Sequence, residues 1–144
     1  MIRPLVVAVL VAGWSLVGCA SEPSETTPPG YYFPINGSSP NSGPAAALTG
    51  VVKVSGGCLT VTQEGTPGPA YLVGWPTSVR LALDASGAPV ILQGTSAVAT
   101  PGSRVWLEGG AYESSDDEAF ARSKLNAPVP CPGPIFLAWK LEPQ

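Results

Sequence analysis

Residues 50–63 read GVVKVSGGCLTVTQ, and two runs rich in valine and threonine lie on either side of Ser55-Gly56-Gly57. Valine and threonine favour an extended backbone, whereas paired glycines supply the conformational freedom of a tight turn. The stretch therefore predicts two strands, 50–54 and 58–63, joined by a turn.

The same pattern recurs along the chain at intervals of roughly ten residues. Residues 79–84 (VRLALD) and 104–108 (RVWLE) alternate apolar and polar side chains, as half-buried strands do. Further strands are predicted at 70–75, 89–93, 95–99 and 135–141. Glycine and proline, 17 of each, supply the turns between them. We therefore predict a mainly β domain over residues 47–144, a small antiparallel β-barrel or sandwich.

One segment, residues 115–125 (SDDEAFARSKL), departs from this pattern. Ser115 and Glu118 have capping-box spacing, acids fill the first turn, and Arg122 and Lys124 fill the last, so a short helix is expected. The three adjacent acids lack the alternating ligand spacing of a calcium loop, and helix capping accounts for them. A small barrel with one helix resembles OB-type architecture in outline, although no sequence motif carries that resemblance.

Residues 1–18 are typical of a signal peptide. Arg3 supplies a positive charge, and residues 5–18 (LVVAVLVAGWSLVG) carry none. This apolar run is shorter than the roughly 20 residues that a spanning helix needs. The alternatives are a plain secretory signal followed by an incidental cysteine and a transmembrane anchor.

Leu16-Val17-Gly18-Cys19 follows directly and resembles the lipobox of bacterial lipoproteins. The resemblance implies a diacylglyceryl group on the sulfur of Cys19 and cleavage before this residue. Membrane lipid is then the first partner, and the chain is expected on the cell membrane or outer membrane, facing the periplasm or the cell exterior. The absence of aspartate at Ala20 favours the outer membrane in organisms that have one.

Residues 19–46 comprise the lipidated Cys19 and a segment rich in proline, serine and glycine, for which we predict a disordered linker. Such a chain spans roughly 30 Å, enough to hold a domain clear of lipid headgroups. Tyr31-Tyr32-Phe33 interrupts this composition. These rings either pack on the domain or recognise an envelope component, and the tendency of aromatic rings toward burial favours packing.

The chain has three cysteines. If Cys19 carries lipid, Cys58 and Cys131 remain as a pair in an oxidising compartment, which predicts a disulfide between them. The alternative is two buried thiols.

Composition excludes several classes of function. The chain contains no histidine, so Ser-His and Cys-His catalytic dyads and histidine-ligated metal sites are ruled out. The net charge is −3 and no cluster of Lys or Arg exists, which argues against nucleic-acid binding. Gly109-Gly110 lacks the Lys-Ser/Thr of a phosphate-binding loop and is interpreted as a bend at a strand end. No cofactor or metal is expected.

Trp106 is the strongest candidate for binding. If Val105 and Leu107 face the core, Trp106 shares the opposite face with Arg104 and Glu108. An exposed tryptophan flanked by opposite charges suits a sugar ring or a partner surface. The alternative is a strand buried on both faces. By their positions, Trp75 and Trp139 are expected in the core.

These observations favour a non-catalytic binding or scaffolding module, tethered by lipid, with an envelope protein or glycan as its partner. The alternative is a hydrolase of envelope polymers that works through carboxylates. That function requires two carboxylates in one cleft, and Asp84 and Glu108 could provide them if the fold brought them together.

Overall fold

The computed structural model describes residues 27–37, 45–65, 67–125 and 131–144. The segment expected to be a signal peptide, the sequence that resembles a lipobox, and Cys19 lie outside this range. The elements in chain order are β1 (Ile35–Asn36), β2 (Ala46–Ser55), β3 (Cys58–Gln63), β4 (Ala70–Pro76), β5 (Val79–Leu83), β6 (Pro89–Gln93), β7 (Ser96–Ala99), β8 (Arg104–Tyr112), α1 (Ser115–Leu125) and β9 (Ile135–Pro143).

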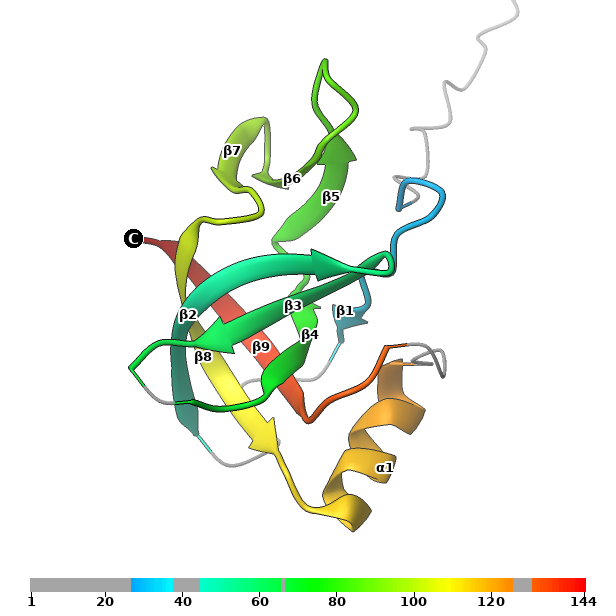
Figure 1. The fold of residues 1–144 in the computed structure, drawn as a ribbon, viewed down its shortest axis with the longest axis vertical. Helices are drawn as coiled ribbons and strands as arrows, with labels where there is room; N and C mark the ends of the chain where they lie inside the picture. Colours follow the sequence, from blue (N-terminus) through cyan, green and yellow to red (C-terminus); the bar gives the residue numbers. More distant parts are fainter. Residues whose placement is uncertain (1–26, 38–44, 66, 126–130) are drawn as a thin grey trace, which may run out of the picture.

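Five strands close into a barrel in the order β4-β3-β2-β8-β9, with β9 pairing back to β4 (Figure 1). The prediction of a mainly β fold with one short helix is confirmed. The barrel is mixed and not purely antiparallel, because β4 and β9 run parallel. A closed ring with an odd number of strands cannot alternate direction throughout, so at least one neighbouring pair must be parallel.

The barrel is filled by the inward-facing residues of its strands. Burial alternates along the start of β8, as the sequence predicted, whereas β4 is buried on both faces. Val52, Val61, Trp75, Val105 and Leu107 are among the fully buried side chains. The burial of Trp75 confirms its expected place in the core.

β5, β6 and β7 form a separate antiparallel sheet over one end of the barrel, here called the cap sheet (Figure 1). Its inward side chains Val79, Leu81, Ile91 and Ala99 belong to the same apolar cluster as the barrel core. The cap sheet therefore closes the barrel end with apolar side chains.

Residues 27–37, here called the strap, lie within the segment expected to be a linker, yet they pack on the barrel. The ring of Phe33 stacks on Trp75 at 4.9 Å between centroids and an interplanar angle of 8°. The Tyr32 hydroxyl donates a hydrogen bond to the Leu125 carbonyl at 2.6 Å, and β1 pairs in parallel with β4. Of the two expectations for Tyr31-Tyr32-Phe33, packing is the one the structure shows, and the folded unit includes this part of the expected linker.

The helix α1 has the predicted bounds, but its cap is one residue earlier than expected. The Ser114 hydroxyl accepts a hydrogen bond from the Asp117 amide at 3.2 Å and donates one to Asp117 Oδ2 at 2.6 Å. Ser114 thus caps the helix in the place that the sequence assigned to Ser115, since Ser115 is already the first helical residue. Within the described residues, no helix has the length and apolar character to cross a membrane.

β8 runs through Gly109-Gly110 to Tyr112 and does not end there, so the predicted bend is replaced by a bulge. The register with β9 shifts between Glu108 and Gly109, which leaves Trp139 without a direct partner on β8. Because the bulge interrupts the alternation, Trp139 is half-buried and not a core residue as expected.

Candidate functional site

Trp106 lies on the outer wall of the barrel. Its neighbours Val105 and Leu107 are fully buried, whereas the Trp106 side chain is only partly buried. The predicted alternation of β8 is confirmed here, and the alternative of a strand buried on both faces is wrong. Across the sheet, Trp106 sits between Thr49 of β2 and Glu142 of β9.

A shallow surface cavity of about 330 Å³ opens beside the indole ring. It is lined by Ala45, Ala46, Ala47, Trp106 and Glu108. The register places Ala47 directly opposite Glu108, so the start of β2 forms one wall. Alanine side chains end at Cβ, so the wall that β2 contributes beside the indole is low.

Two charged residues of β9, Lys140 and Glu142, lie beside the indole ring. Lys140 Nζ lies 5.7 Å from the centroid of Trp106, within cation–π range, and 2.6 Å from Glu142 Oε1. The hydrogen bond and the charge of Glu142, followed by the charge of Glu108, raise the pKa of Lys140. Lys140 therefore carries its proton at neutral pH and is held by its strand neighbour.

Arg104 belongs to the same outer face, but it does not line the cavity. Its Nη2 atom lies 2.5 Å from Oε2 of Glu64, an exposed ion pair beyond the end of β3. The structure thus brings Trp106 and Glu108 together, as the sequence suggested, and directs Arg104 to another partner. Glu108 is left as the acid beside the indole in the described cavity lining.

Asp84 and Glu108, the possible catalytic carboxylates, do not meet in the described cavity beside Trp106. Asp84 lies in the turn between β5 and β6, where its Oδ1 atom accepts bonds from the Ser86 hydroxyl at 2.6 Å and the Ala88 amide at 3.0 Å. These bonds, led by that of Ser86, lower the pKa of Asp84. Asp84 acts as a turn residue, and it does not line the cavity that Glu108 lines. Among the residues the structure describes, no group of three or more His, Cys, Asp or Glu side chains could hold a metal ion.

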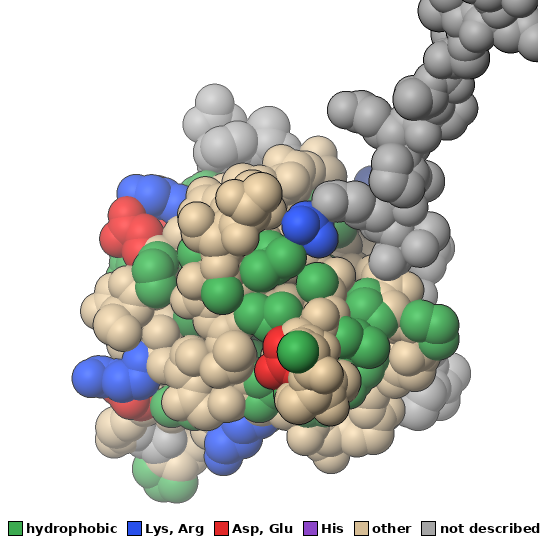
Figure 2. All heavy atoms as spheres, turned by 90° about the horizontal axis from the view of Figure 1, so that it is seen from above, with side chains coloured by type: hydrophobic (Ala, Val, Ile, Leu, Met, Phe, Trp, Pro, Cys, Tyr) green, Lys and Arg blue, Asp and Glu red, His purple; other side chains and the backbone are tan. Residues whose placement is uncertain are grey.

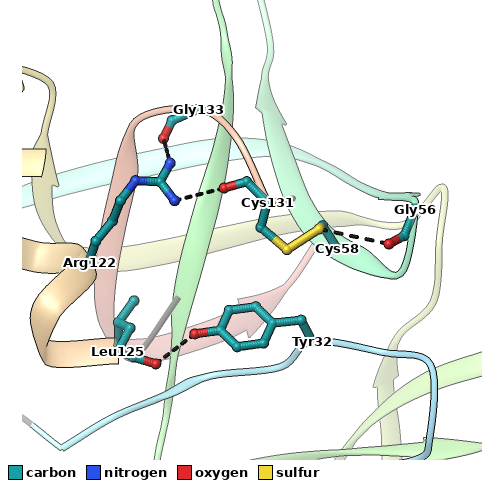
Figure 3. The surroundings of a disulfide bond; sticks show 7 residues. All are labelled: Tyr32, Gly56, Cys58, Arg122, Leu125, Cys131 and Gly133. Carbon is teal, nitrogen blue, oxygen red and sulfur yellow. Dashed lines mark hydrogen bonds between the residues drawn. A yellow bond between two sulfur atoms is a disulfide. The ribbon is translucent and has the colours of Figure 1, made fainter. Parts of the chain in front are cut away.

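Cys58 and Cys131 form the predicted disulfide, with 5.6 Å between their Cα atoms (Figure 3). The bond joins the first residue of β3 to the loop that leads into β9. Arg122 of α1 reinforces this loop, because its guanidinium donates to the carbonyls of Cys131 and Gly133, each at 2.7 Å. Glu118 in turn accepts from Nε of Arg122 at 2.8 Å. The disulfide and this planar donor group together fix α1 and the start of β9 on the barrel.

Comparisons of the chain with protein-family models, with curated proteins and with solved structures give no match. The kind of ligand is therefore inferred from the chemistry of the surface around Trp106. This surface offers the indole ring, the Glu108 carboxylate in the cavity lining, small walls, and an ammonium group on Lys140 that is paired with the second carboxylate, that of Glu142. Such a surface can bind a ligand, but it lacks a nucleophile with its base or a second carboxylate in the described cavity lining.

Lys140 and the three alanines are the site residues that sequence reasoning missed. Lys140 stands in a continuous strand pattern, and only the register of β8 against β9 places it near Trp106. Ala45-Ala46-Ala47 falls at the end of the expected linker, where small residues indicate nothing in particular. The sequence predicted only that Trp106 lies on the outer face of its strand. Finding these residues would also have required knowing which strands pair with it.

Proposed function

We propose that this protein is a lipid-anchored component of the cell envelope whose barrel binds a sugar ring of an envelope glycan, without catalysis, through the surface around Trp106. The observation that carries the proposal is the partly exposed indole beside an open cavity with a carboxylate on its rim. Pockets with an aromatic wall and a few convergent polar groups are typical ligand sites.

A sugar ring fits the chemistry of this surface. The C–H face of a pyranose is apolar and can stack on an indole, while its hydroxyl groups can donate to the Glu108 carboxylate. The alanine walls leave room for the rest of the ring. Lys140 is paired with Glu142 and stands opposite Glu108 across the sheet, so these three side chains together carry one net negative charge. This favours neutral sugars and amino sugars over acidic ones.

The tether in this proposal rests on the sequence around Cys19. Each buried methylene of an acyl chain contributes about 0.8 kcal/mol, and two chains give stable attachment where one is marginal. The strap fixes the folded unit from residue 27 onward. The chain between Cys19 and the strap would then set the distance of the binding surface from the membrane.

A carboxylate-based hydrolase is the alternative function. Such an enzyme needs two carboxyl groups roughly 5–10 Å apart in one cleft. In the described lining of the Trp106 cavity Glu108 has no acidic partner, and Asp84 serves a turn. The site therefore supports binding better than hydrolysis.

Isothermal titration with a neutral N-acetylhexosamine oligosaccharide tests the binding proposal. We expect Trp106→Ala to weaken binding at least tenfold, which corresponds to about 1.4 kcal/mol. Phe120→Ala is the matched control, since Phe120 is an aromatic residue 54% exposed on α1, away from the cavity. Equal affinity of Trp106→Ala and wild type would overturn the proposal. Release of shorter fragments during the titration would favour the hydrolase.

Detergent phase separation tests the anchor. We expect Cys19→Ser to be exported but to leave the detergent phase, because serine cannot form the thioether that carries the acyl chains. A variant that stays as firmly membrane-bound as the wild type would contradict lipidation at Cys19.

A further inference from the structure

The cap sheet has an edge strand with unusual surroundings. In the described residues, β5 pairs only with β6, so its other edge has no strand beside it. The described large hydrophobic residues that are exposed are Ile35, Leu83 and Phe120, and two of them flank this edge. Leu83 ends β5 and is 44% exposed, while Ile35 of the strap is 42% exposed. Hydrophobic side chains gather at this end of the molecule with few charges among them (Figure 2).

The backbone of β5 offers hydrogen bonds along that edge. The Asp84 amide donates to the Ala88 carbonyl at 2.8 Å and closes the hairpin with β6. Bonding alternates along an antiparallel pair, so the amides and carbonyls of Arg80 and Ala82 point toward β6. Those of Val79, Leu81 and Leu83 then point toward the edge without a paired strand, where Val79 and Leu81 are 4% and 5% exposed and line a cavity beside the strap. An edge of this kind can add another strand.

A cavity of about 160 Å³ lies between the inner end of β5 and the strap. Its apolar lining comes from Phe33, Ile35, Val79 and Leu81. The exposed Leu83 stands at the outer end of the same strand and alternates onto the same side as Val79 and Leu81. β5 thus has an apolar cavity beside its first residues and an exposed apolar side chain, Leu83, at its last residue.

We propose that two copies of the chain pair edge to edge through β5, antiparallel about Leu81, and form a symmetric dimer. A two-fold axis at Leu81 places Leu83 of each copy directly opposite Val79 of the other, beside the cavity. Each pair of outward-facing residues can exchange two backbone bonds. The same patch serves both copies, as a two-fold interface requires.

Side-chain size and charge also suit this register. Arg80, whose Nη2 atom donates to the Gly94 carbonyl of its own chain at 3.4 Å, stands opposite Ala82 of the second copy, and the small alanine leaves room for the guanidinium. Asp84 of that copy is the diagonal neighbour of Arg80, a position within reach of long side chains. Asp84 is ionised at neutral pH, because its turn hydrogen bonds lower its pKa. The two-fold axis brings this complementary pair together twice.

Thr27, the first described residue of the strap, also lines the cavity beside β5. The chain toward Cys19 therefore leaves each copy next to the interface, which lets both copies attach to one membrane. Confinement to a surface raises the effective concentration of the partner, so a modest interface suffices. The dimer does not depend on lipidation, and it can be measured without lipid.

Sedimentation equilibrium of the full chain carrying Cys19→Ser tests the dimer at micromolar to submillimolar concentrations. We expect a reversible dimer whose dissociation constant rises at least tenfold in Leu83→Asp. The matched control is Ala97→Asp, which adds the same charge at an exposed position of β7, the opposite edge strand. Circular dichroism should show that both variants stay folded. A monomeric Cys19→Ser protein, or a Leu83→Asp variant that dimerises as well as its parent, would overturn the proposal.

Cysteine crosslinking tests the register separately. An equal mixture of Arg80→Cys and Ala82→Cys proteins should give a disulfide-linked dimer on a non-reducing gel, because the two positions face each other across the axis. Each variant alone should crosslink less, since like positions are diagonal. A dimer that persists by sedimentation without this crosslink would show that another surface is used. Trp106→Ala should leave the dimer intact, which separates this interface from the glycan proposal.

Discussion

Tyr71 joins the barrel core to the surface through a single side chain. Its ring is buried and meets Phe136 edge to face at 6.1 Å, and its hydroxyl donates a hydrogen bond to Oε1 of Glu113. Burial, followed by this hydrogen bond and the charge of Glu113, raises the pKa of Tyr71 from 10.0 to about 12. Below pH 10 the hydroxyl is protonated in both the folded and the unfolded chain, and its contribution to stability is fully present. That contribution is lost as the pH rises through 12, because the unfolded chain ionises first.

The pKa of Tyr71 can be measured as the difference in alkaline absorbance titration between the wild type and Tyr71→Phe. We expect a midpoint near pH 12 for the missing tyrosine, shifted downward in Glu113→Gln. Tyr71→Phe should also lower the free energy of unfolding by about 0.5–1.5 kcal/mol at neutral pH. A midpoint near 10 in the folded protein would show that Tyr71 is neither buried nor bonded to Glu113.

Gly109 occupies the bulge between β8 and β9, where no side chain fits. A Cβ atom at this position would overlap the Leu137 carbonyl oxygen and the ring of Phe136. We expect Gly109→Ala to lower the free energy of unfolding by about 1–3 kcal/mol in urea denaturation. Gly37→Ala is the control, since a Cβ at Gly37 meets nothing within 4 Å. Equal stability of the two variants would mean that the bulge does not have this geometry.

At the scale of the element, the N-terminal cap of α1 gives two neighbouring serines different roles. Ser114 exchanges hydrogen bonds with Asp117, whereas Ser115 is the first helical residue. We expect Ser114→Ala to cost about 1 kcal/mol and to lower the melting temperature by about 4–8 °C. Ser115→Ala should have little effect, because alanine is a better helix former. A lower melting temperature for Ser115→Ala than for Ser114→Ala would instead indicate that Ser115 caps the helix, as the sequence suggested.

The approximate positions of most elements could be predicted from the sequence, because alternation and turn residues are local signals, but β1 was not predicted and β2 and β8 extend beyond their predicted residues. β3 and β6 have the predicted bounds, as does α1. The parallel pairing of β4 with β9 could not be predicted, since it follows from closure of a ring with an odd number of strands. The division into barrel and cap sheet could not be predicted from the sequence either, because the strands of both sheets show the same local pattern.

The candidate site was predictable only in part. Alternation along β8 indicated that Trp106 and Glu108 share an outer face. The position of Lys140 over the indole depends on the register with β9, and that register includes a bulge at Trp139. The strap was obscured by linker composition, and only its aromatic residues indicated that it would pack.

At the scale of the whole molecule, the disulfide between Cys58 and Cys131 joins two parts of the chain that lie far apart in the sequence. It closes a separation of 73 residues, for which chain entropy gives about 4 kcal/mol of stabilisation. We expect Cys131→Ala to lower the melting temperature by more than about 10 °C, at roughly 4–8 °C per kcal/mol. Alkylation of either cysteine in the native, non-reduced protein would contradict the pairing.

The barrel, the cap sheet and the strap place three surfaces in different parts of one small domain. The outer wall at Trp106 suits a glycan, the β5 edge suits a second copy, and the strap leads toward the proposed anchor. This separation means that binding, pairing and attachment can be disrupted one at a time. It also means that a failure of one proposal leaves the other two open to their own tests.

The central proposal, glycan binding at Trp106, is tested most directly by the indole N–H resonances of isotope-labelled protein. Trp106 is partly exposed at the cavity, and Trp75 is fully buried and serves as the internal reference. Titration with a neutral N-acetylhexosamine oligosaccharide should shift the Trp106 resonance in a saturable manner and leave that of Trp75 in place. An unmoved Trp106 resonance at millimolar oligosaccharide, or an equal shift of Trp75, would contradict the proposal.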